Sequence, residues 1–411
     1  MRILLLSQYF PPEVGSAAAK MAEMAAYLQH RGHQVDVVSQ IPSYPQGVVY
    51  PGYQGAWFRQ EQKNGVRITR TWSYASPERD RFKPRLANYA SFMGTSLAGI
   101  LKGPRSDLML VYSPPPFLGL TAAAVSAVWG CPFIYWVNDL WPRAALSLEF
   151  MQEGPLYRLA CAMESFIYRR AARIYVYSGQ MLEEVVRGGG SRARLECHPL
   201  WIDTKVFYPD PRGAQEVRRE YGWKGKFVVL YGGNLGLAQG LDVFIESARL
   251  LRELKDIHFV LLGSGVEKEN LSRLVAEYQL ANVEFISHKP KEQVSAYFSA
   301  ADLLFAHLKA APHRVGTVPE KILAYMACGR PVLMAAQEGA ALEVIRKHRC
   351  GLTAPPDNPE AVARAIQSLY EDSSRIEPLG REGRRAVERH YAANLVLQAM
   401  EASMVNLAGG S

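Results

Sequence analysis

The stretch FVVLYGGNLGLAQGLDVFIESA, residues 227–248, begins with an apolar run over residues 227–231. Such a run is typical of a strand buried on both faces of a parallel sheet. We expect a helix after it, joined by a turn at residues 232–236 whose glycines bring bare backbone close to a ligand. Unpaired N–H groups at a helix N-terminus favour a phosphate. The stretch therefore predicts a nucleotide-diphosphate site at a strand-to-helix turn, with the alternative that the glycines only make the turn tight.

The same turn argues against a dinucleotide-dependent oxidoreductase. The fingerprint of that class is G-x-G-x-x-G, and here Gly232-Gly233-x-x-Gly236 is one residue short.

Strand-like runs alternate with helix-compatible segments along the whole chain. Residues 2–7, 17–30 and 34–39 predict a first strand–helix–strand unit. Further strands are predicted at residues 66–70, 107–112, 132–137, 173–177, 227–231, 258–262, 283–286, 303–307, 331–334 and 350–353, with closing helices at residues 359–371 and 381–404. This alternation is typical of doubly wound parallel α/β sheets, in which ligands lie beyond the carboxyl ends of the strands.

A proline-containing segment, residues 201–211, predicts a hinge between two Rossmann-like domains. We expect an N-terminal domain over residues 1–205 and a C-terminal domain over residues 206–385. A C-terminal helix over about residues 386–411 is expected to return to the first domain. Two lobes facing across a cleft would close a ligand off from water.

Composition narrows the function classes. The chain has 411 residues, 48% of them hydrophobic and 21% charged, which indicates a folded protein of two or three domains. Its net charge of +8 favours anionic partners such as nucleotide sugars, diphospho-lipids, bilayer surfaces or nucleic acid. Its five cysteines are widely spaced without a C-x-x-C pair, which predicts neither a disulfide framework nor a zinc site and fits a reducing cytoplasm. We expect no export signal and no membrane span.

Residues 79–101 combine a basic collar with an apolar stripe. The collar consists of Arg79, Arg81, Lys83 and Arg85. The stripe follows at near-helical spacing and consists of Leu86, Tyr89, Phe92, Met93, Leu97, Ile100 and Leu101. This arrangement predicts docking on an anionic membrane surface, with the alternative of an internal helix whose stripe faces the core.

Two further positions stand at the carboxyl ends of predicted strands. Gly15 and Ser16 begin the first helix, where backbone N–H groups hold an anion or where the serine simply caps the helix. Asp139 directly follows the strand at residues 132–137, which predicts a polar group at the mouth of the site.

The chain resembles the retaining GT-B glycosyltransferases of family 4, in the branch that builds O-antigen, capsule and colanic-acid-type polysaccharides. The resemblance covers nearly the whole chain, and its motifs occur in order. They are Tyr9-Phe-Pro-Pro-Glu13 with Gly15, Arg31-Gly-His-Gln-Val35, Asp139-Leu-Trp-Pro142, Tyr231-Gly-Gly-Asn-Leu-Gly236 with Gln239-Gly-Leu241, Leu262-Gly-Ser-Gly265, and Pro319-Glu-Lys321 with Tyr325-Met-Ala-Cys-Gly-Arg-Pro331.

The resemblance implies roles for these residues. The N–H groups of Gly233, Asn234, Leu235 and Gly236 would bind the diphosphate, with Gln239 in the same turn and Gly263, Ser264 and Gly265 near the base. Lys321 would add a mobile charge, and Gly15 and Ser16 would approach the sugar and the β-phosphate from the opposite lobe. Asp139 would anchor a sugar or acceptor hydroxyl, with the alternative of a loop carboxylate bonded to backbone. Arg143 would reach the phosphates or remain a surface residue.

This chain departs from the family at the usual pair of glutamates, whose places are taken by Gly316 and Ala324. Glu320 is near but out of register for the ribose contact. The usual Arg and Lys of the diphosphate turn are replaced by Asn234 and Gln239. More of the phosphate binding is thereby left to backbone dipoles, to Lys321 and to a further cation, Arg143 or Arg314.

The resemblance implies transfer of a hexosyl or N-acetylhexosaminyl group from a nucleotide-diphosphate sugar, UDP-linked in our expectation. The acceptor would be a polyprenyl-diphosphate-linked saccharide or a growing polysaccharide, at the inner face of the cell membrane. No Asp-x-Asp motif is present, so we expect a metal-independent reaction without a cofactor. Alternatives are a nucleotide-sugar epimerase of the same fold and a catalytically silent sugar-nucleotide-binding subunit. Nucleic-acid binding is not expected, because the charge does not form a basic stripe interleaved with aromatic residues.

Overall fold

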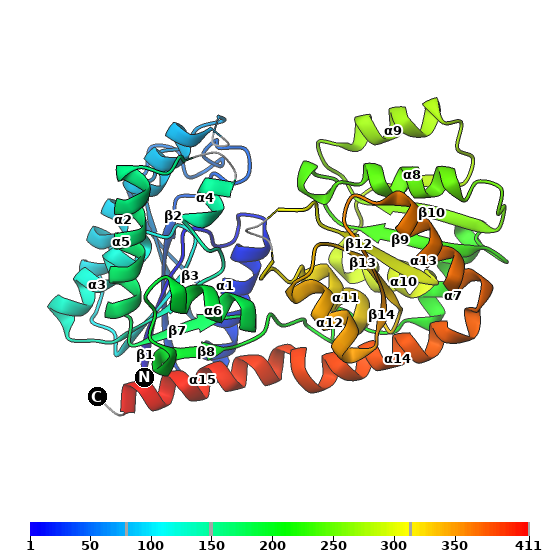
Figure 1. The fold of residues 1–411 in the computed structure, drawn as a ribbon. Helices are drawn as coiled ribbons and strands as arrows, with labels where there is room; N and C mark the ends of the chain where they lie inside the picture. The colour runs from blue at the N-terminus through cyan, green and yellow to red at the C-terminus, as the bar shows by residue number, and fades with distance from the viewer. Residues whose placement is uncertain (79–80, 148–150, 312–314, 410–411) are drawn as a thin grey trace. The chain divides into compact units, whose positions relative to one another are not determined.

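The computed structural model describes residues 1–78, 81–147, 151–311 and 315–409. The chain forms two compact units, Met1–His198 with Leu397–Ser411, and Pro199–Val396. Figure 1 shows that each unit is built around its own sheet with helices beside it. Within the described residues, no helix is both long and apolar enough to span a bilayer.

The first unit contains an eight-stranded sheet in the order β3-β4-β2-β1-β5-β6-β7-β8, in which only the pair β3–β4 is antiparallel. Its strands are β1 (Arg2–Leu6), β2 (Gln34–Gln40), β3 (Phe58–Lys63), β4 (Val66–Thr71), β5 (Leu108–Tyr112), β6 (Phe133–Trp136), β7 (Arg173–Val176) and β8 (Leu195–Cys197). The sequence does not predict β3 or β8. The first is an edge strand of mostly exposed polar residues, and the second is only three residues long.

Helices accompany this sheet along most of the first unit. They are α1 (Ser16–His30), α2 (Phe82–Leu101), α3 (Leu118–Trp129), α4 (Arg143–Ser147), α5 (Pro155–Arg170) and α6 (Gly179–Arg187). The strands β1 and β5 at the centre are almost fully buried, which matches their uninterrupted apolar sequences.

The second unit contains six parallel strands in the order β11-β10-β9-β12-β13-β14. They are β9 (Phe227–Gly232), β10 (Ile257–Leu262), β11 (Val283–Ile286), β12 (Leu303–His307), β13 (Val332–Ala335) and β14 (Gly351–Ala354). Side chains of β9 alternate between two cores: Val229 and Tyr231 pack on one face, and Val228 and Leu230 pack on the other. The predicted double-sided burial of this strand is therefore confirmed.

Helices cover both faces of the second sheet. One core includes side chains of α8 (Asp242–Leu250), α9 (Lys268–Glu277) and α13 (Pro359–Glu371). The other includes side chains of α7 (Pro211–Glu220), α10 (Val294–Ala300), α11 (Glu320–Ala327), α12 (Ala340–His348) and α14 (Ile376–Ala386). The expectation of a doubly wound α/β architecture is confirmed for both units.

The segment predicted as a hinge is firmly attached to the second unit. Trp201 and Ile202 are buried, and Ile202 exchanges backbone hydrogen bonds with Tyr391 and Ala393 at 2.8 and 3.0 Å. These bonds explain why the boundary lies at residues 198/199, before the prolines, rather than at residues 205/206.

The C-terminal helix α15 (Ala393–Gly409) is preceded by a π-helical turn over Val387–Tyr391, so the predicted single helix at 381–404 is interrupted. From Leu397 onward α15 belongs to the first unit. There Glu401 accepts hydrogen bonds from Tyr27 Oη at 2.8 Å and from Arg31 Nε at 3.1 Å, and its carboxylate lies 3.0 Å from His33 Nε2. Desolvation opposes ionisation of Glu401, but these bonds outweigh it and lower its pKa.

Glu401→Gln should lower the free energy of unfolding at neutral pH by about 1–3 kcal/mol, because Tyr27, Arg31 and His33 lose a largely buried, charged acceptor. The contribution of a carboxylate with a lowered pKa is present above its unfolded pKa and is lost as the pH falls through its folded pKa. The variant and the wild type should therefore converge in acid, below the ordinary glutamate value of 4.5. Denaturant unfolding across that pH range measures the difference.

The matched control is Glu382→Gln, which removes an exposed carboxylate paired with Arg385 at 2.7 Å on α14. We expect a change within about 0.5 kcal/mol for this exposed pair. A difference between wild type and Glu401→Gln that persists unchanged in acid would show that charge is not the cause.

Candidate functional site

Two glycine turns at the carboxyl edge of the second sheet pack backbone against backbone. A Cβ placed on Gly263 would lie 1.9 Å from the carbonyl oxygen of Gly233, and one on Gly265 would lie 2.2 Å from the carbonyl oxygen of Leu235. Gly233 and Gly263 also have φ angles of 136° and 152°, which side chains disfavour. These glycines are therefore required for contact between the turns after β9 and β10, whatever they do for a ligand.

The contact uses amides that we expected to bind a diphosphate. The Gly233 N–H donates to the Leu262 carbonyl at 2.9 Å, and the Leu235 N–H donates to the Ser264 carbonyl at 2.8 Å. The prediction that all four N–H groups of this turn face a ligand is therefore wrong for Gly233 and Leu235. Among the described residues, the N–H groups of Asn234 and Gly236 have no acceptor.

The helix also begins later than expected. A 3-10 turn at Leu237–Gln239 and a left-handed Gly240 follow the glycine turn, and α8 starts only at Asp242. The glycine turn therefore does not form the N-terminus of that helix. An anion at this turn would therefore meet individual amides rather than a helix dipole.

The side chains of Asn234 and Gln239 border the free amide of Gly236. A Cβ on Gly236 would lie 2.7 Å from Asn234 Nδ2 and 2.8 Å from Gln239 Oε1. The buried Gln239 Oε1 has no hydrogen-bond partner among the described atoms. By the resemblance, these two neutral amides stand at the positions of the family's usual Arg and Lys.

Lys321 brings a cation to the same turn from the first helical turn of α11. Its Nζ donates to Tyr231 Oη at 2.5 Å and lies 3.8 Å from the centroid of that ring. The Tyr231 hydroxyl in turn donates to the carbonyl oxygen of Asn234 at 2.7 Å. Desolvation lowers the pKa of Lys321 to about 7. The sequence singled out Lys321, and the structure adds Tyr231 as the group that connects it to the turn.

Two other residues hold this edge in place, in roles that the sequence does not predict. Tyr325 Oη accepts from the Gly232 N–H at 2.9 Å and donates to the Gly232 carbonyl at 3.1 Å. His307 Nδ1 lies 2.6 Å from the Gln239 carbonyl, and its Nε2 accepts from the Asp357 N–H at 3.0 Å. Desolvation lowers the pKa of His307, so the neutral ring bridges two loops. Their sequence signal is only a polar aromatic group on an otherwise apolar element.

A cavity of about 250 Å³ opens beside Lys321. Its lining includes Gly233, His288, Lys289, Phe298, Glu320 and Ala324. Glu320 and Ala324 are four residues apart on α11 and therefore lie on the same face of the helix. Glu320 thus carries a carboxylate to the cavity one turn before the position where the family has its second glutamate.

The first unit presents a second polar site at the carboxyl edge of its own sheet. Gly15 is the N-cap of α1, and Ser16 is the first residue of the helix. A Cβ on Gly15 would lie 3.3 Å from Tyr44 Cε1, so the helix start approaches the Tyr44 ring closely. The alternative of a serine N-cap is wrong, because the cap position belongs to Gly15.

Glu13 fixes the loop that precedes α1. Its buried carboxylate accepts from the backbone N–H groups of Ser43 and Tyr44, both at 3.0 Å, and from Gln40 Nε2 at 2.7 Å. Desolvation outweighs these bonds and raises the pKa of Glu13. Glu13 is thus a positioning residue within the Tyr9–Glu13 motif, which the motif alone does not reveal.

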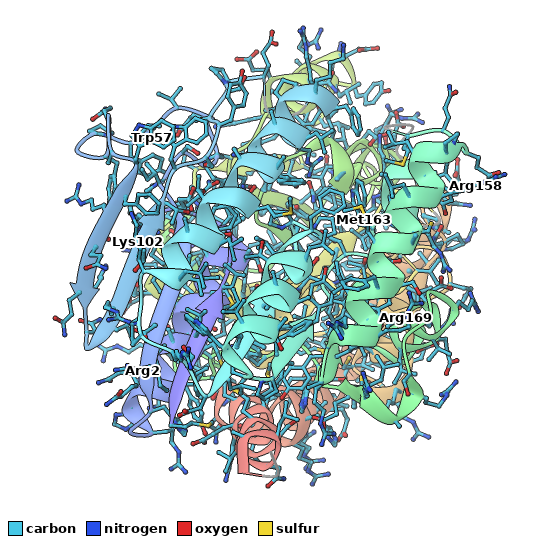
Figure 2. All side chains as sticks on the ribbon, turned by 90° about the vertical axis from the view of Figure 1, so that its left-hand side faces the viewer. Arg2, Trp57, Lys102, Arg158, Met163 and Arg169 are labelled. Atoms are coloured by element: carbon cyan, nitrogen blue, oxygen red, sulfur yellow. The ribbon has the colours of Figure 1, made fainter. Side chains whose placement is uncertain are left out.

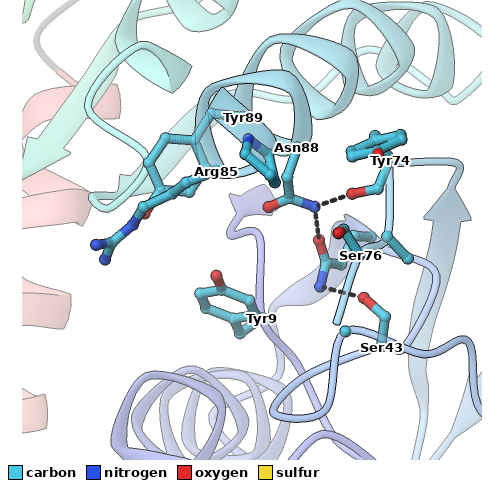
Figure 3. A pocket seen from close by; sticks show the side chains of 11 residues that line it. Tyr9, Ser43, Tyr74, Ser76, Arg85, Asn88 and Tyr89 are labelled. Carbon is cyan, nitrogen blue, oxygen red and sulfur yellow. Dashed lines mark hydrogen bonds between the residues drawn. The ribbon is translucent and has the colours of Figure 1, made fainter. Parts of the chain in front are cut away.

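Figure 3 shows a narrow polar pocket next to this loop, between Tyr9, Tyr74 and Asn88. Asn88 Nδ2 donates to the Tyr74 carbonyl at 2.8 Å, and Asn88 Oδ1 accepts from Gln8 Nε2 at 2.6 Å. The cavity measures about 10 Å³, which accommodates about one water molecule. Asn88 in its lining is therefore already hydrogen-bonded within the protein.

The predicted cations of the first unit have different partners. Arg85 Nε donates to Tyr89 Oη at 3.1 Å and attracts Asp139 electrostatically, so it belongs to the site rather than to an exposed collar. Asp139 is exposed and has no hydrogen bond to a described residue. Arg143 is ion-paired with Glu184 of α6, which opposes the predicted role of Arg143 in binding phosphates.

The predicted collar and stripe at residues 79–101 are only partly exposed. Arg79 and Arg314 lie outside the described residues, Lys83 is exposed, and Arg81 is exposed but pairs with Glu78 at 3.1 Å. Tyr89, Phe92 and Ile100 of α2 are buried, as the alternative of a core-facing stripe requires. Leu86 and Leu101 remain exposed at the two ends of the helix.

Two protein-family models match the chain. The model described as Glycosyl transferase 4-like domain matches residues 15–201, and the one described as Glycosyl transferases group 1 matches residues 214–386. The chain is 26% identical to the probable glycosyltransferase WbjE of Pseudomonas aeruginosa, over 72% of this chain and 73% of WbjE. It is 23% identical to the putative colanic acid biosynthesis glycosyl transferase WcaI of Escherichia coli K12, over 89% of this chain and 91% of WcaI.

Solved structures show the same fold. The crystal structure of Anabaena Alr3699/HepE in complex with UDP matches with a TM-score of 0.76 at 15% identity, over 99% of this chain and 100% of that one. WaaG, a glycosyltransferase involved in lipopolysaccharide biosynthesis, matches with a TM-score of 0.70 at 16% identity, over 97% of this chain and 98% of WaaG.

Gly263→Ala should lower the free energy of unfolding by at least about 3 kcal/mol, because the methyl group meets backbone that cannot move aside and φ is unfavourable. Denaturant unfolding followed by circular dichroism measures the loss. The matched control is Gly94→Ala in α2, where a Cβ meets no atom within 4 Å. The control should be neutral or stabilising by up to about 1 kcal/mol. Equal unfolding midpoints for Gly263→Ala and wild type would refute the packing argument.

Proposed function

Because the chain is a nucleotide-sugar-dependent glycosyltransferase of group 1, family 4, with the GT-B fold, we propose that it is a retaining enzyme of cell-surface polysaccharide synthesis. Its donor would be a UDP-linked hexose or N-acetylhexosamine, and its acceptor a polyprenyl-diphosphate-linked saccharide or growing polysaccharide. It would work as a peripheral protein at the inner face of the cell membrane.

The observation that carries the proposal is the setting of Lys321. Its ammonium group lies beside the exposed Gly233 turn and is held there by Tyr231, at the edge of the 250 Å³ cavity. A desolvated ammonium group is an unfavourable arrangement unless an anion joins it. A diphosphate bound to the amides of Asn234 and Gly236 would supply that anion.

The chemistry would rest on the departure of the nucleoside diphosphate. As the bond from the sugar to the β-phosphate breaks, negative charge grows on the phosphate and the sugar carbon becomes oxocarbenium-like. Preorganised N–H dipoles and the Lys321 cation would stabilise that charge, commonly the largest catalytic contribution. Gly15 and Ser16 of the first unit would approach the β-phosphate and the sugar, and Asp139 would hold a sugar or acceptor hydroxyl.

Glu320 would bind the ribose hydroxyls of the nucleotide. The family's usual carboxylates are absent at Gly316 and Ala324, and Glu320 reaches the same cavity from the same face of α11. A carboxylate accepts hydrogen bonds from a diol more strongly than a neutral group does.

The acceptor and the location are proposed from the relatives and from the net charge. WcaI is named for colanic acid biosynthesis, and HepE was crystallised in complex with UDP. The net charge of +8 suits a diphosphate-linked lipid and an anionic bilayer.

Product analysis tests the function. With a UDP-sugar and a lipid-diphosphate saccharide, the wild type should release UDP and lengthen the acceptor with retained anomeric configuration, and Glu320→Gln should raise the donor KM by about tenfold. Release of an altered free sugar without an acceptor would indicate the epimerase alternative. Binding of donor without any turnover across a panel of sugars and acceptors would indicate a silent binding subunit.

The affinity for a nucleotide sugar should fall as the pH rises from about 7 to 8.5, by up to about tenfold per pH unit, because binding requires the protonated lysine. The sign follows from the lowered pKa of Lys321, about 7 in the free protein, which a bound diphosphate would raise again. Binding should therefore take up a proton, which calorimetry in buffers of different ionisation enthalpy detects. Lys321→Met should bind weakly at every pH, with a flat profile.

Lys289→Met is the matched control, because Lys289 lines the same cavity and its hydrogen bonds with Tyr297 and Tyr221 raise its pKa. Lys289 stays charged over this range, so its removal should leave the pH slope unchanged. A steep profile that survives in Lys321→Met would reject Lys321 as the titrating group.

A further inference from the structure

Helix α5 carries an apolar stripe on its outward face. Leu156, Leu159 and Phe166 are 54, 56 and 40% exposed, and Met163 is half-buried between them. Their spacing of three, four and three residues places all four side chains in one line along the helix. Exposed apolar side chains that form one continuous patch indicate a binding surface, whereas single scattered ones do not.

The stripe is separate from the face that holds α5 on its unit. Ala160, Ile167 and Tyr168 are buried on that inner face. A Cβ on Gly119 of α3 would lie 2.3 Å from Ile167 Cγ2, so α3 and α5 pack closely through Ile167. The fold therefore does not need the outer stripe for its own core.

The charges beside the stripe have one sign. Arg158, Arg169 and Arg170 are exposed, and the Arg170 guanidinium lies 5.8 Å from the centroid of the Phe166 ring. The single acidic residue of α5, Glu164, points inward, where its carboxylate accepts from Tyr168 Oη at 2.9 Å. Desolvation raises the pKa of Glu164 to about 7, which weakens its negative charge further.

The neighbouring helices extend the same surface. Helix α3 packs against both α2 and α5, and neither α2 nor α3 contains an Asp or Glu residue. Val128 of α3 is 65% exposed, and Lys102 at the end of α2 lies over the Phe58 ring. Figure 2 looks onto this face, with Arg158, Met163 and Arg169 along α5 and Lys102 at the end of α2. We call the outer surface of these three helices the α2–α3–α5 face.

We infer that the α2–α3–α5 face docks on an anionic lipid bilayer, with the α5 stripe entering the headgroup region. Apolar side chains in line, flanked by arginines, are the pattern of helices that lie in a membrane interface. Basic residues near such a surface each strengthen binding to anionic lipid. The inference rests on the proposed function for its lipid-linked acceptor and names the surface, centred on α5, that would meet the lipid.

The observations favour a bilayer over other partners. Self-association through this face would bring two sets of arginines together, which like-charge repulsion opposes. A single-stranded nucleic acid would need aromatic side chains for stacking, whereas this stripe is mainly aliphatic. A duplex would be held by polar and basic contacts to its phosphates, to which the apolar stripe contributes nothing. Among the described residues next to these helices, exposed Glu153 just before α5 and exposed Glu78 just before α2 depart from the pattern, and Glu78 is paired with Arg81.

The surface also connects to the candidate site of the first unit. The starts of α2 and α5 meet α4 in a small apolar cluster that includes Phe82, Ala145, Tyr157 and Trp141. Trp141 lies two residues after Asp139, so exposed Leu156 and Leu159 belong to the same end of the unit as the proposed acceptor anchor. A lipid-linked acceptor would thus be presented from the side where the stripe begins.

Vesicle co-sedimentation tests the inference, with full-length protein and phosphatidylcholine vesicles containing about one third phosphatidylglycerol. The wild type should sediment with these vesicles and not with pure phosphatidylcholine. Leu156→Ser/Leu159→Ser/Phe166→Ser and Arg158→Glu/Arg169→Glu/Arg170→Glu should each lower the partition coefficient by more than about tenfold. Added salt should weaken binding of the wild type, because exposed charges are screened.

The matched control for the charge variant is Arg212→Glu/Arg381→Glu/Arg385→Glu, which carries the same net charge but changes exposed arginines of the second unit. It should keep most vesicle binding. All variants should keep nucleotide-sugar binding. Measuring vesicle binding and nucleotide-sugar binding separately therefore distinguishes an error in the docking inference from an error in the proposed function. Equal vesicle binding by both α5 variants and wild type would overturn the inference. The inference would also be overturned if the only effect of the α5 substitutions were a loss of self-association or a loss of nucleic-acid retention.

Discussion

The site in the second unit depends on the absence of side chains at Gly263 and Gly265, because backbone atoms of the neighbouring turn lie where their Cβ atoms would be. The carbonyl of Gly233 occupies the place where a Gly263 side chain would be, at 1.9 Å from its Cβ position. The turns after β9 and β10 can therefore exchange the backbone hydrogen bonds that fix their relative position. Because neighbouring parallel strands end at the same edge, this rigid pair of turns fixes the amides beside which α11 places Lys321.

This constraint changes how an anion would be bound. Two of the four amides of the turn are used to hold it, so the turn gains rigidity and loses donors. What remains is the pair Asn234 and Gly236, together with Lys321, whose bond to Tyr231 ties it to the carbonyl of Asn234. At the turn itself, a phosphate would meet two fixed dipoles and Lys321, whose charge depends on pH.

The sequence predicts the architecture well because buried parallel strands have uninterrupted apolar sequences, as β1 and β9 do. It misses β3, whose exposed residues FRQEQK have no such pattern, since edge pairing depends on a neighbour that the sequence does not identify. The late start of α8 depends on the left-handed Gly240, and a glycine alone does not reveal its φ angle. The engaged amides of Gly233 and Leu235 and the pairing of Arg143 depend on residues distant in the sequence. Local motifs therefore locate a site but do not reveal which of its groups are already bonded.

The distribution of charge over the surface is likewise not predicted by the total charge of the sequence. In the second unit many arginines have a carboxylate three or four residues away on the same helix, as in Arg249 with Glu246 and Arg385 with Glu382, so their fields are largely local. Helices α2 and α3 contain no acidic residue, and the glutamate of α5 faces inward. The field outside these three helices therefore comes from basic groups next to apolar side chains. A value of +8 for the whole chain gives no sign of this arrangement. The distribution follows from which helix faces are buried, because burial of Ile167 and Tyr168 is what turns Leu156, Arg158 and Phe166 outward.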